Sequence, residues 1–274
     1  MRLHDALDAT VSARPLFAEA SKSGAKLSAD DVKSINRWTR DNIEADRLVS
    51  FPVLAIDTAP TRNGIVYSAE SQKASVKAWV GKTFLFNSSG GADHTLAAAS
   101  QVGRIYRSQL VTTAQGETGT LVWVYSVRGV SQQTDEFIGK IESGILREVS
   151  LHVMVEGVNC SICNVAAQDC EKAHQPGQKY GKQTCSLITQ GPLEPLEVSA
   201  VAVPGSTSAR VMSDDDATKL VALREALAPA GVDQLNSRPR NETSIERPPT
   251  VFESARDQRL RLSSPRRPRF HGRF

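Results

Sequence analysis

The chain has 274 residues, of which 40% are hydrophobic and 23% are charged, as in ordinary soluble globular proteins. These values exclude a fibrous or wholly disordered protein, and no apolar run reaches the ~18 residues that a membrane-spanning helix needs. The net charge of +3 conceals an asymmetry, because residues 236–274 contain ten arginines and only four acidic residues.

Residues 1–47 are predicted to form an N-terminal helical region. Ser28 is a candidate N-cap, and apolar residues recur at helical spacing from Val32 to Leu48. Acidic residues near the N-terminus lie where a signal peptide has its apolar core, so we expect a cytosolic protein. Its cysteines are then expected to be reduced.

Short apolar runs of strand length dominate residues 48–213. Strands are predicted at 51–56, 83–86, 102–111, 121–127, 145–155 and 196–203, and helices at 69–80, 135–142 and 214–235, the last with its regular pattern ending near 227. This pattern predicts an α+β fold: a mixed β-barrel of about seven strands surrounded by helices. No glycine-rich phosphate-binding loop is present.

Residues 236–274 are predicted to be a disordered basic tail, because they contain five prolines and show no apolar periodicity. Two interpretations remain open for this segment. It can attach electrostatically to an acidic partner, such as an acidic protein surface or DNA, or it can simply improve solubility.

All four cysteines lie within 26 residues, between positions 158 and 186. Cys160 and Cys163 are separated by two residues, a spacing that puts two sulfurs on one tight turn beside a metal ion. Cys170, His174 and Cys185 follow. A redox pair would explain the first two cysteines but not the other three residues, so the pattern favours zinc.

Five candidate ligands compete for the four positions of a tetrahedral zinc site. Four cysteines, or three cysteines with His174, both fit the spacing. We expect a closed structural site that stabilises a polar loop, not a catalytic one. A zinc-ribbon nucleic-acid binder is a weaker alternative, because the segment offers few basic or aromatic side chains.

Three separate segments contain the residue types of a serine nucleophile with its base and orienting group. Ser150 lies on a predicted strand, with His152 on the same face. His94 follows Asp93 in a glycine-flanked loop, and Glu197 begins the last predicted strand. Taken singly, each residue has an ordinary structural explanation, but together they can form a catalytic triad.

The order and spacing of these motifs resemble the prohead maturation proteases of tailed bacteriophages. The resemblance covers residues 48–204 and is carried by GILREVS at 144–150, by the cysteine segment, and by EVSAVAVP at 197–204. The segment around Asp93 and His94 is similar to that family's histidine segment. The family resembles herpesvirus assembly proteases, which implies a β-barrel with surrounding helices and a serine on a barrel strand.

The resemblance implies that Ser150 is the nucleophile, His94 the general base and Glu197 the residue that orients the base. It further implies a serine endopeptidase that cleaves capsid and scaffold proteins, and also itself, inside the prohead in the host cytoplasm. His152 stands where the family usually has glycine. This difference motivates an alternative function, a catalytically inactive, zinc-stabilised head-assembly or scaffold-binding protein.

Overall fold

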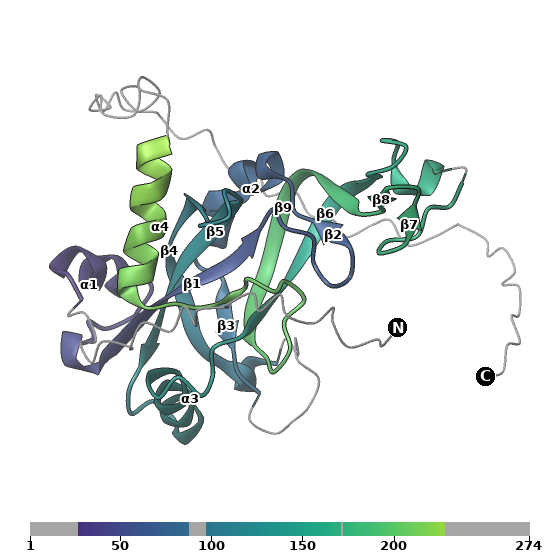
Figure 1. The fold of residues 1–274 in the computed structure, drawn as a ribbon. Coiled ribbons are helices and arrows are strands. Elements are labelled where there is room, and N and C mark those ends of the chain that lie inside the picture. Colours follow the sequence, from purple (N-terminus) through teal and green to yellow (C-terminus); the bar gives the residue numbers. More distant parts are fainter. Residues whose placement is uncertain (1–26, 88–96, 171, 228–274) are drawn as a thin grey trace, which may run out of the picture. The chain divides into compact units, whose positions relative to one another are not determined.

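The computed structural model describes residues 27–87, 97–170 and 172–227, which form a mixed α+β fold (Figure 1). The strands are β1 (Leu48–Asp57), β2 (Ile65–Val66), β3 (Thr83–Leu85), β4 (Gln101–Thr112), β5 (Thr118–Val127), β6 (Val149–Cys160), β7 (Lys179–Tyr180), β8 (Gln183–Thr184), β9 (Leu187–Ala200) and β10 (Arg210–Val211). The α-helices are α1 (Ala29–Asn36), α2 (Ala69–Ser75), α3 (Gln132–Glu142) and α4 (Asp214–Leu227). Single 3-10 turns are η1 (Ala45–Arg47), η2 (Val76–Trp79), η3 (Ala98–Ser100) and η4 (Ala167–Asp169). The predicted α+β class is confirmed.

One sheet contains every described strand except β7 and β8. Its strands follow the order β10-β1-β5-β4-β3-β9-β2, and β6 also pairs with β9. The pairs are antiparallel, except that β9 runs parallel to β2 and β3. A bridge between Glu148 and Arg210 joins the start of β6 to β10. The sheet therefore curls into a half-barrel in which these two strands approach each other.

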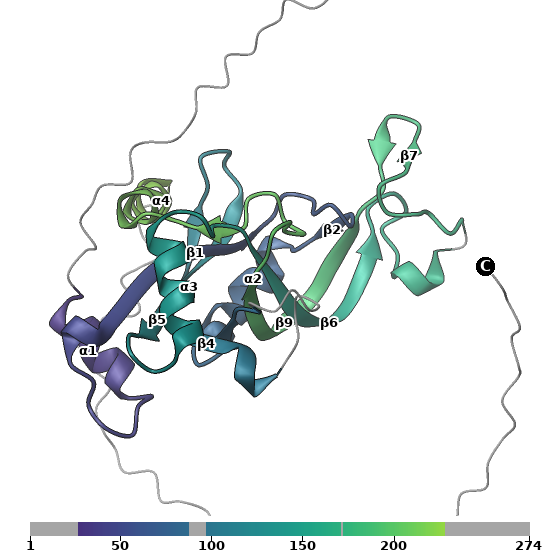
Figure 2. The same ribbon diagram turned by 90° about the horizontal axis from the view of Figure 1, so that it is seen from below.

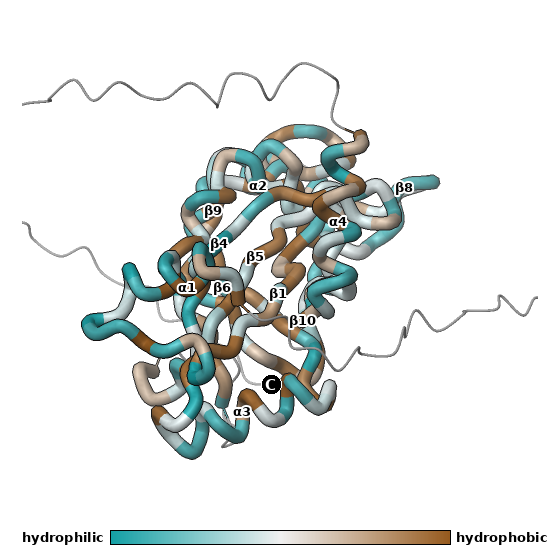
Figure 3. The backbone as a smooth tube through the Cα atoms, turned by 90° about the vertical axis from the view of Figure 1, so that its left-hand side faces the viewer, coloured by the Kyte–Doolittle hydropathy of each residue, from teal (hydrophilic) through white to brown (hydrophobic). Residues whose placement is uncertain are grey.

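Alternating side chains of the central strands build two hydrophobic clusters on opposite faces of the sheet. In β1, Phe51 and Val53 belong to one cluster, while Leu54 belongs to the other. The first cluster also contains Phe137 of α3, and the second contains Ile35 of α1 and residues of α4. Figure 3 shows hydrophobic residues concentrated in β1 and β5.

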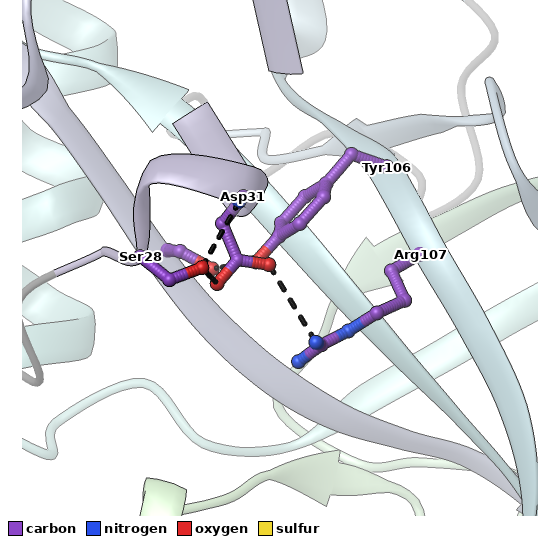
Figure 4. A network of polar contacts seen from close by, with 5 residues as sticks. Ser28, Asp31, Tyr106 and Arg107 are labelled. Atoms are coloured by element: carbon purple, nitrogen blue, oxygen red, sulfur yellow. Dashed lines mark hydrogen bonds and ion pairs between the residues drawn. The ribbon is translucent and has the colours of Figure 1, made fainter. Parts of the chain in front are cut away.

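Polar contacts connect α1 to the face of the sheet that carries the second hydrophobic cluster (Figure 4). Ser28 caps the helix by accepting a hydrogen bond from the Asp31 backbone N–H at 3.1 Å. The Asp31 carboxylate lies 3.5 Å from the guanidinium of Arg107 on β4. Arg107 in turn lies over the ring of Trp123, 3.7 Å from its centroid. This series of contacts thus connects α1 to strands β4 and β5.

The predicted extension of the first helix to Leu48 is wrong, since α1 ends at Asn36. The Asn36 side chain accepts hydrogen bonds from the Ile43 backbone N–H at 3.0 Å and the Thr39 hydroxyl at 3.2 Å. Side-chain bonds of this kind compete with the helical pattern. The apolar residues after Asn36 therefore retain helical spacing without being in the helix.

Strands β6 and β9, which form the longest pairing in the sheet, have a cysteine-rich segment between them. Their pairing runs from Val149 opposite Ala200 to Cys160 opposite Leu187. Residues 161–170 and 172–186 form a small module with β7 and β8 that lies beyond this end of the ribbon in both views (Figures 1 and 2). β6 begins later than predicted, and β9 begins nine residues earlier and ends at Ala200.

The other predicted elements lie close to their observed positions, with β1, β3, β4, β5 and the helices α2, α3 and α4 at or near their expected ranges. The expected basic tail at 236–274 lies outside the described residues, as does the last part of the helix predicted for 214–235. None of the helices in the described ranges is both long and apolar enough to cross a membrane.

Candidate functional site

The predicted nucleophile and orienting carboxylate lie on one face of the β6–β9 pair. Ser150 on β6 lies directly opposite Ser199 on β9, and His152 lies directly opposite Glu197. Directly opposed residues of an antiparallel pair share a face, so all four polar residues share one. The alternate residues, such as Val149 and Val198, belong to the first hydrophobic cluster.

Glu197 is fully buried, with none of its surface exposed to solvent. Ser199, a residue that is 3% exposed, donates a hydrogen bond from its hydroxyl to the Glu197 carboxylate. A buried carboxyl group without hydrogen bonds is costly, so this donor offsets part of the cost of burying Glu197. By contrast, His152 is exposed and Ser150 is half-buried.

Ser150 and Glu197 are diagonal neighbours in this pairing, a relation that separates the two residues by roughly 7–8 Å. Such a span suits an imidazole ring that makes one hydrogen bond to each side chain. The third residue of the predicted triad, His94, lies outside the described residues. The structure thus brings two of the three predicted residues together.

A pocket of about 150 Å³ lies beside Ser150 and Leu151. Its walls come from two loops, one containing Thr61, Asn63 and Tyr67 and the other containing Ser206. The Arg62 backbone N–H donates to the Gly205 carbonyl at 2.8 Å and ties these loops together. None of the described residues that line the pocket is charged, which favours an uncharged guest.

Tyr67, one of the described residues that line the pocket, is the only one of them with a phenol group. Burial raises the pKa of its hydroxyl, so the group stays protonated. No local motif in the sequence marks these loop residues, because they come from segments that are far apart in the chain. Their only signal in the sequence was polar composition, which is common to most loops.

The cysteine module brings together four ligand atoms. The side chains of Cys160, Cys163, Cys170 and His174 each contribute one atom, and all four atoms lie within 4.8 Å of one another. His174 Nδ1 lies 3.5 Å from Cys160 Sγ and 3.4 Å from Cys170 Sγ, and Cys163 Sγ lies 3.5 Å from Cys170 Sγ. Around zinc with bonds of about 2.0–2.3 Å, the corners of a tetrahedron lie roughly 3.5–3.8 Å apart.

The chemistry of this donor set also fits a metal ion. Hydrogen bonds from the backbone N–H of Cys163, and then of Ile162, lower the pKa of the Cys160 thiol to about 6. The turn therefore stabilises the thiolate, which is the form that binds metals. Three sulfurs and one imidazole nitrogen in tetrahedral arrangement are typical of structural zinc sites.

Cys185, the fifth candidate, lies outside the group of four. Its buried Sγ lies 3.9 Å from Cys160 Sγ, but it does not come within 4.8 Å of every other ligand atom. Burial raises the pKa of its thiol to about 11, so this side chain stays neutral beside the cluster. Of the two ligand sets that fit the spacing, the structure thus supports three cysteines with His174.

The module has an unusual backbone conformation at two residues other than glycine. Ala173 has φ of 45° and Asn164 has φ of 58°, and no other non-glycine residue in the described part of the chain has a positive φ. Asparagine tolerates this region, whereas alanine is strained in it by about 1–2 kcal/mol. Ala173 directly precedes His174, so the strain lies at a metal-ligand candidate.

Comparisons of the chain with protein-family models, with curated proteins and with solved structures found no match.

Proposed function

We propose that the protein is a serine endopeptidase of the prohead maturation type, with Ser150 as nucleophile, His94 as general base and Glu197 as the group that orients the base. The observation that carries this proposal is the diagonal pairing of Ser150 with a fully buried Glu197 on one face of the β6–β9 ribbon. A buried acid fixed by a neighbouring hydroxyl suits the orienting role.

The chemistry follows from these roles. His94 accepts the Ser150 proton as the serine oxygen attacks a peptide carbonyl, and backbone N–H groups stabilise the resulting oxyanion. The C–N bond then breaks, the amine leaves with the proton from His94, and an acyl-serine remains. Water hydrolyses the ester with His94 as base again and regenerates the serine.

The pocket beside Ser150 is the place where a substrate side chain next to the scissile bond would bind. Its size of about 150 Å³ suits a group up to the size of benzene. Within the same proposal, the substrates are capsid and scaffold proteins, and cleavage takes place inside the prohead in the host cytoplasm.

The second part of the proposal is that the cluster of three cysteines and His174 binds zinc in a structural role. The ion adds no step to peptide cleavage. It crosslinks the cysteine module at the far end of the strands that contain Ser150 and Glu197. A polar segment of this size has little apolar surface to bury, so metal binding would supply much of its folding free energy.

The test of the peptidase is the intact mass of wild-type protein, incubated alone and with the capsid or scaffold protein of the same phage. We expect defined fragments with the wild type and none with Ser150→Ala or His94→Ala. Glu197→Gln should slow cleavage by roughly 10²–10⁴-fold, because the base loses its orienting charge. His152→Ala is the matched control and should retain cleavage.

A peptidyl diphenyl phosphonate separates an inactive relative from an enzyme that needs assembly. In this reaction the serine oxygen bonds to phosphorus and one phenol leaves with the serine proton. Labelling that requires Ser150 and His94 supports the peptidase even where no substrate is cleaved. If neither cleavage nor labelling occurs, the non-catalytic scaffold-binding function, which the exposed His152 beside Ser150 favours, replaces it.

A further inference from the structure

The turn at residues 61–65 lies between the cysteine module and the pocket beside Ser150. On one side it supplies Thr61, Asn63 and Ile65 to the pocket wall. On the other side, Gly64 packs against the module so closely that a Cβ at this position would lie 2.7 Å from Pro176 Cβ. Gly64 is buried and has φ of +71°, so glycine is required for both reasons.

Hydrogen bonds hold the pocket side of this turn as a compact unit. The Gly64 N–H donates to the Thr61 carbonyl at 2.9 Å, and the Ile65 N–H donates to the Thr61 hydroxyl at 3.0 Å. The Arg62 N–H reaches the opposite wall of the pocket at Gly205. A displacement of the turn would therefore move both walls together.

On the side of the cysteine module, the residue that contacts Gly64 is close in the chain to a proposed metal ligand. Pro176 lies two residues after His174. The next residue, Gly177, donates its N–H to the Cys185 carbonyl at 2.8 Å, and the Cys185 N–H donates to the Gln178 carbonyl at 2.8 Å. The segment that touches Gly64 is thus held at one end by a ligand and at the other by the strand leading into β9.

We propose that a zinc ion bound by Cys160, Cys163, Cys170 and His174 positions the 61–65 turn through the contact between Pro176 and Gly64, and so sets the shape of the pocket beside Ser150. Pro176 and Gly64 are positioning residues in this arrangement. The inference rests on the zinc part of the proposed function and is independent of whether the pocket serves peptide cleavage.

Amide hydrogen exchange of the full-length protein, with zinc and after chelation, tests the coupling directly. Removing zinc should speed exchange in residues 160–186, and should also speed it by roughly tenfold or more at the Thr61, Gly64 and Ile65 amides. The β4–β5 hairpin, remote from the module, should be unchanged. Faster exchange confined to 160–186, or no response to zinc in that segment, would overturn the proposal.

Two variants keep all four ligands and test the contact itself. Pro176→Gly should still bind zinc but should give fast exchange at the 61–65 amides with or without the ion. Gly64→Ala should do the same, because its methyl group meets Pro176. Gly116→Ala is the matched control: its φ is +82°, yet nothing lies within 4 Å of the added Cβ. The proposal fails if Gly116→Ala and Gly64→Ala affect the turn equally.

The rate of phosphonate labelling at Ser150 separates this inference from the peptidase. Zinc-dependent exchange in the turn without any labelling would leave the coupling in place and remove the peptidase. Labelling that proceeds equally with and without zinc, while exchange at 61–65 is also unchanged, would retain the peptidase and remove the coupling.

Discussion

Ala173 is a residue whose strain can be measured. Its left-handed backbone, with φ of 45°, places His174 beside two cysteine sulfurs. Strained residues persist where the surroundings hold them, and here the surroundings are the ligands of a proposed metal site. The strained backbone of Ala173 is therefore maintained by the geometry of the whole ligand cluster.

Replacing Ala173 by glycine should stabilise the zinc-loaded protein by roughly 1 kcal/mol, because glycine adopts positive φ without strain. Urea unfolding monitored by circular dichroism measures the change. The matched control is Ala166→Gly in the same module, where φ is −54° and glycine should be slightly destabilising. Equal destabilisation by both substitutions would mean that the Ala173 methyl group contributes packing that outweighs its strain.

The residues of the candidate site differ in how far the sequence could predict them. The candidate metal ligands lie close together in the chain, and the Cys-x-x-Cys spacing acts over one turn, so the sequence groups all five candidates and the structure brings four of them within 4.8 Å of one another. Ser150 and Glu197 meet only through strand pairing, which no local pattern reveals. The pocket residues come from two loops and from strands β2 and β6, and no local pattern in the sequence brings them together.

At the scale of elements, strands with clear apolar runs were predicted and the first half of β9 was not. Pro192 and Pro195 interrupt its pattern, since proline is rare inside sheets. The structure explains their presence. β2 pairs with β9 at 187–188 and β3 pairs with it at 197–199, so both prolines lie in the interval between these partners. The gap between these two partner strands thus accommodates prolines that would be unfavourable in an ordinary central strand.

Ile35 is the one buried residue of helix α1. Ile35 has no exposed surface and lies in the second hydrophobic cluster. Truncation should leave a cavity, so we expect Ile35→Ala to lower the free energy of unfolding by about 2–4 kcal/mol. Ile145→Ala is the matched control, since Ile145 is 74% exposed, and should cost less than about 0.5 kcal/mol.

Chemical denaturation of both isoleucine variants gives these differences directly. Similar losses for the two variants would contradict the assignment of Ile35 to the core. A loss for Ile35→Ala well below 1 kcal/mol would show that α1 contributes little to the stability of the sheet, and that its polar contacts through Asp31 and Arg107 are the main anchor.

At the scale of the whole molecule, charge is divided between the tail and the rest of the chain. The ten arginines of residues 236–274 exceed the local acidic residues by six, which leaves the remainder slightly negative. Opposite charges on one chain favour different partners at different ends. We expect the tail to be the part that binds polyanions.

Deleting residues 236–274 should weaken binding to a short duplex DNA and flatten its dependence on salt, because each phosphate contact contributes a slope of about 0.9. Fluorescence anisotropy between 50 and 200 mM salt, a range over which such contacts respond strongly, measures both. A full-length variant with the ten arginines replaced by glutamine is the control for chain length. Binding that is unchanged in both variants would leave only the solubilising interpretation of the tail.

The β6–β9 ribbon also has a consequence for how the protein folds. A slip of one residue between these strands would turn Ser150 toward the core and Val149 outward. Zinc bound by Cys160, Cys163, Cys170 and His174 would tie His174 to the end of β6 and so shorten the loop that leads to β9, before the longer loop to Ala200 has to close. We therefore expect zinc to speed refolding by nucleating the ribbon from its cysteine end, so that the ion helps the strand that contains Ser150 to pair with β9 in the native register.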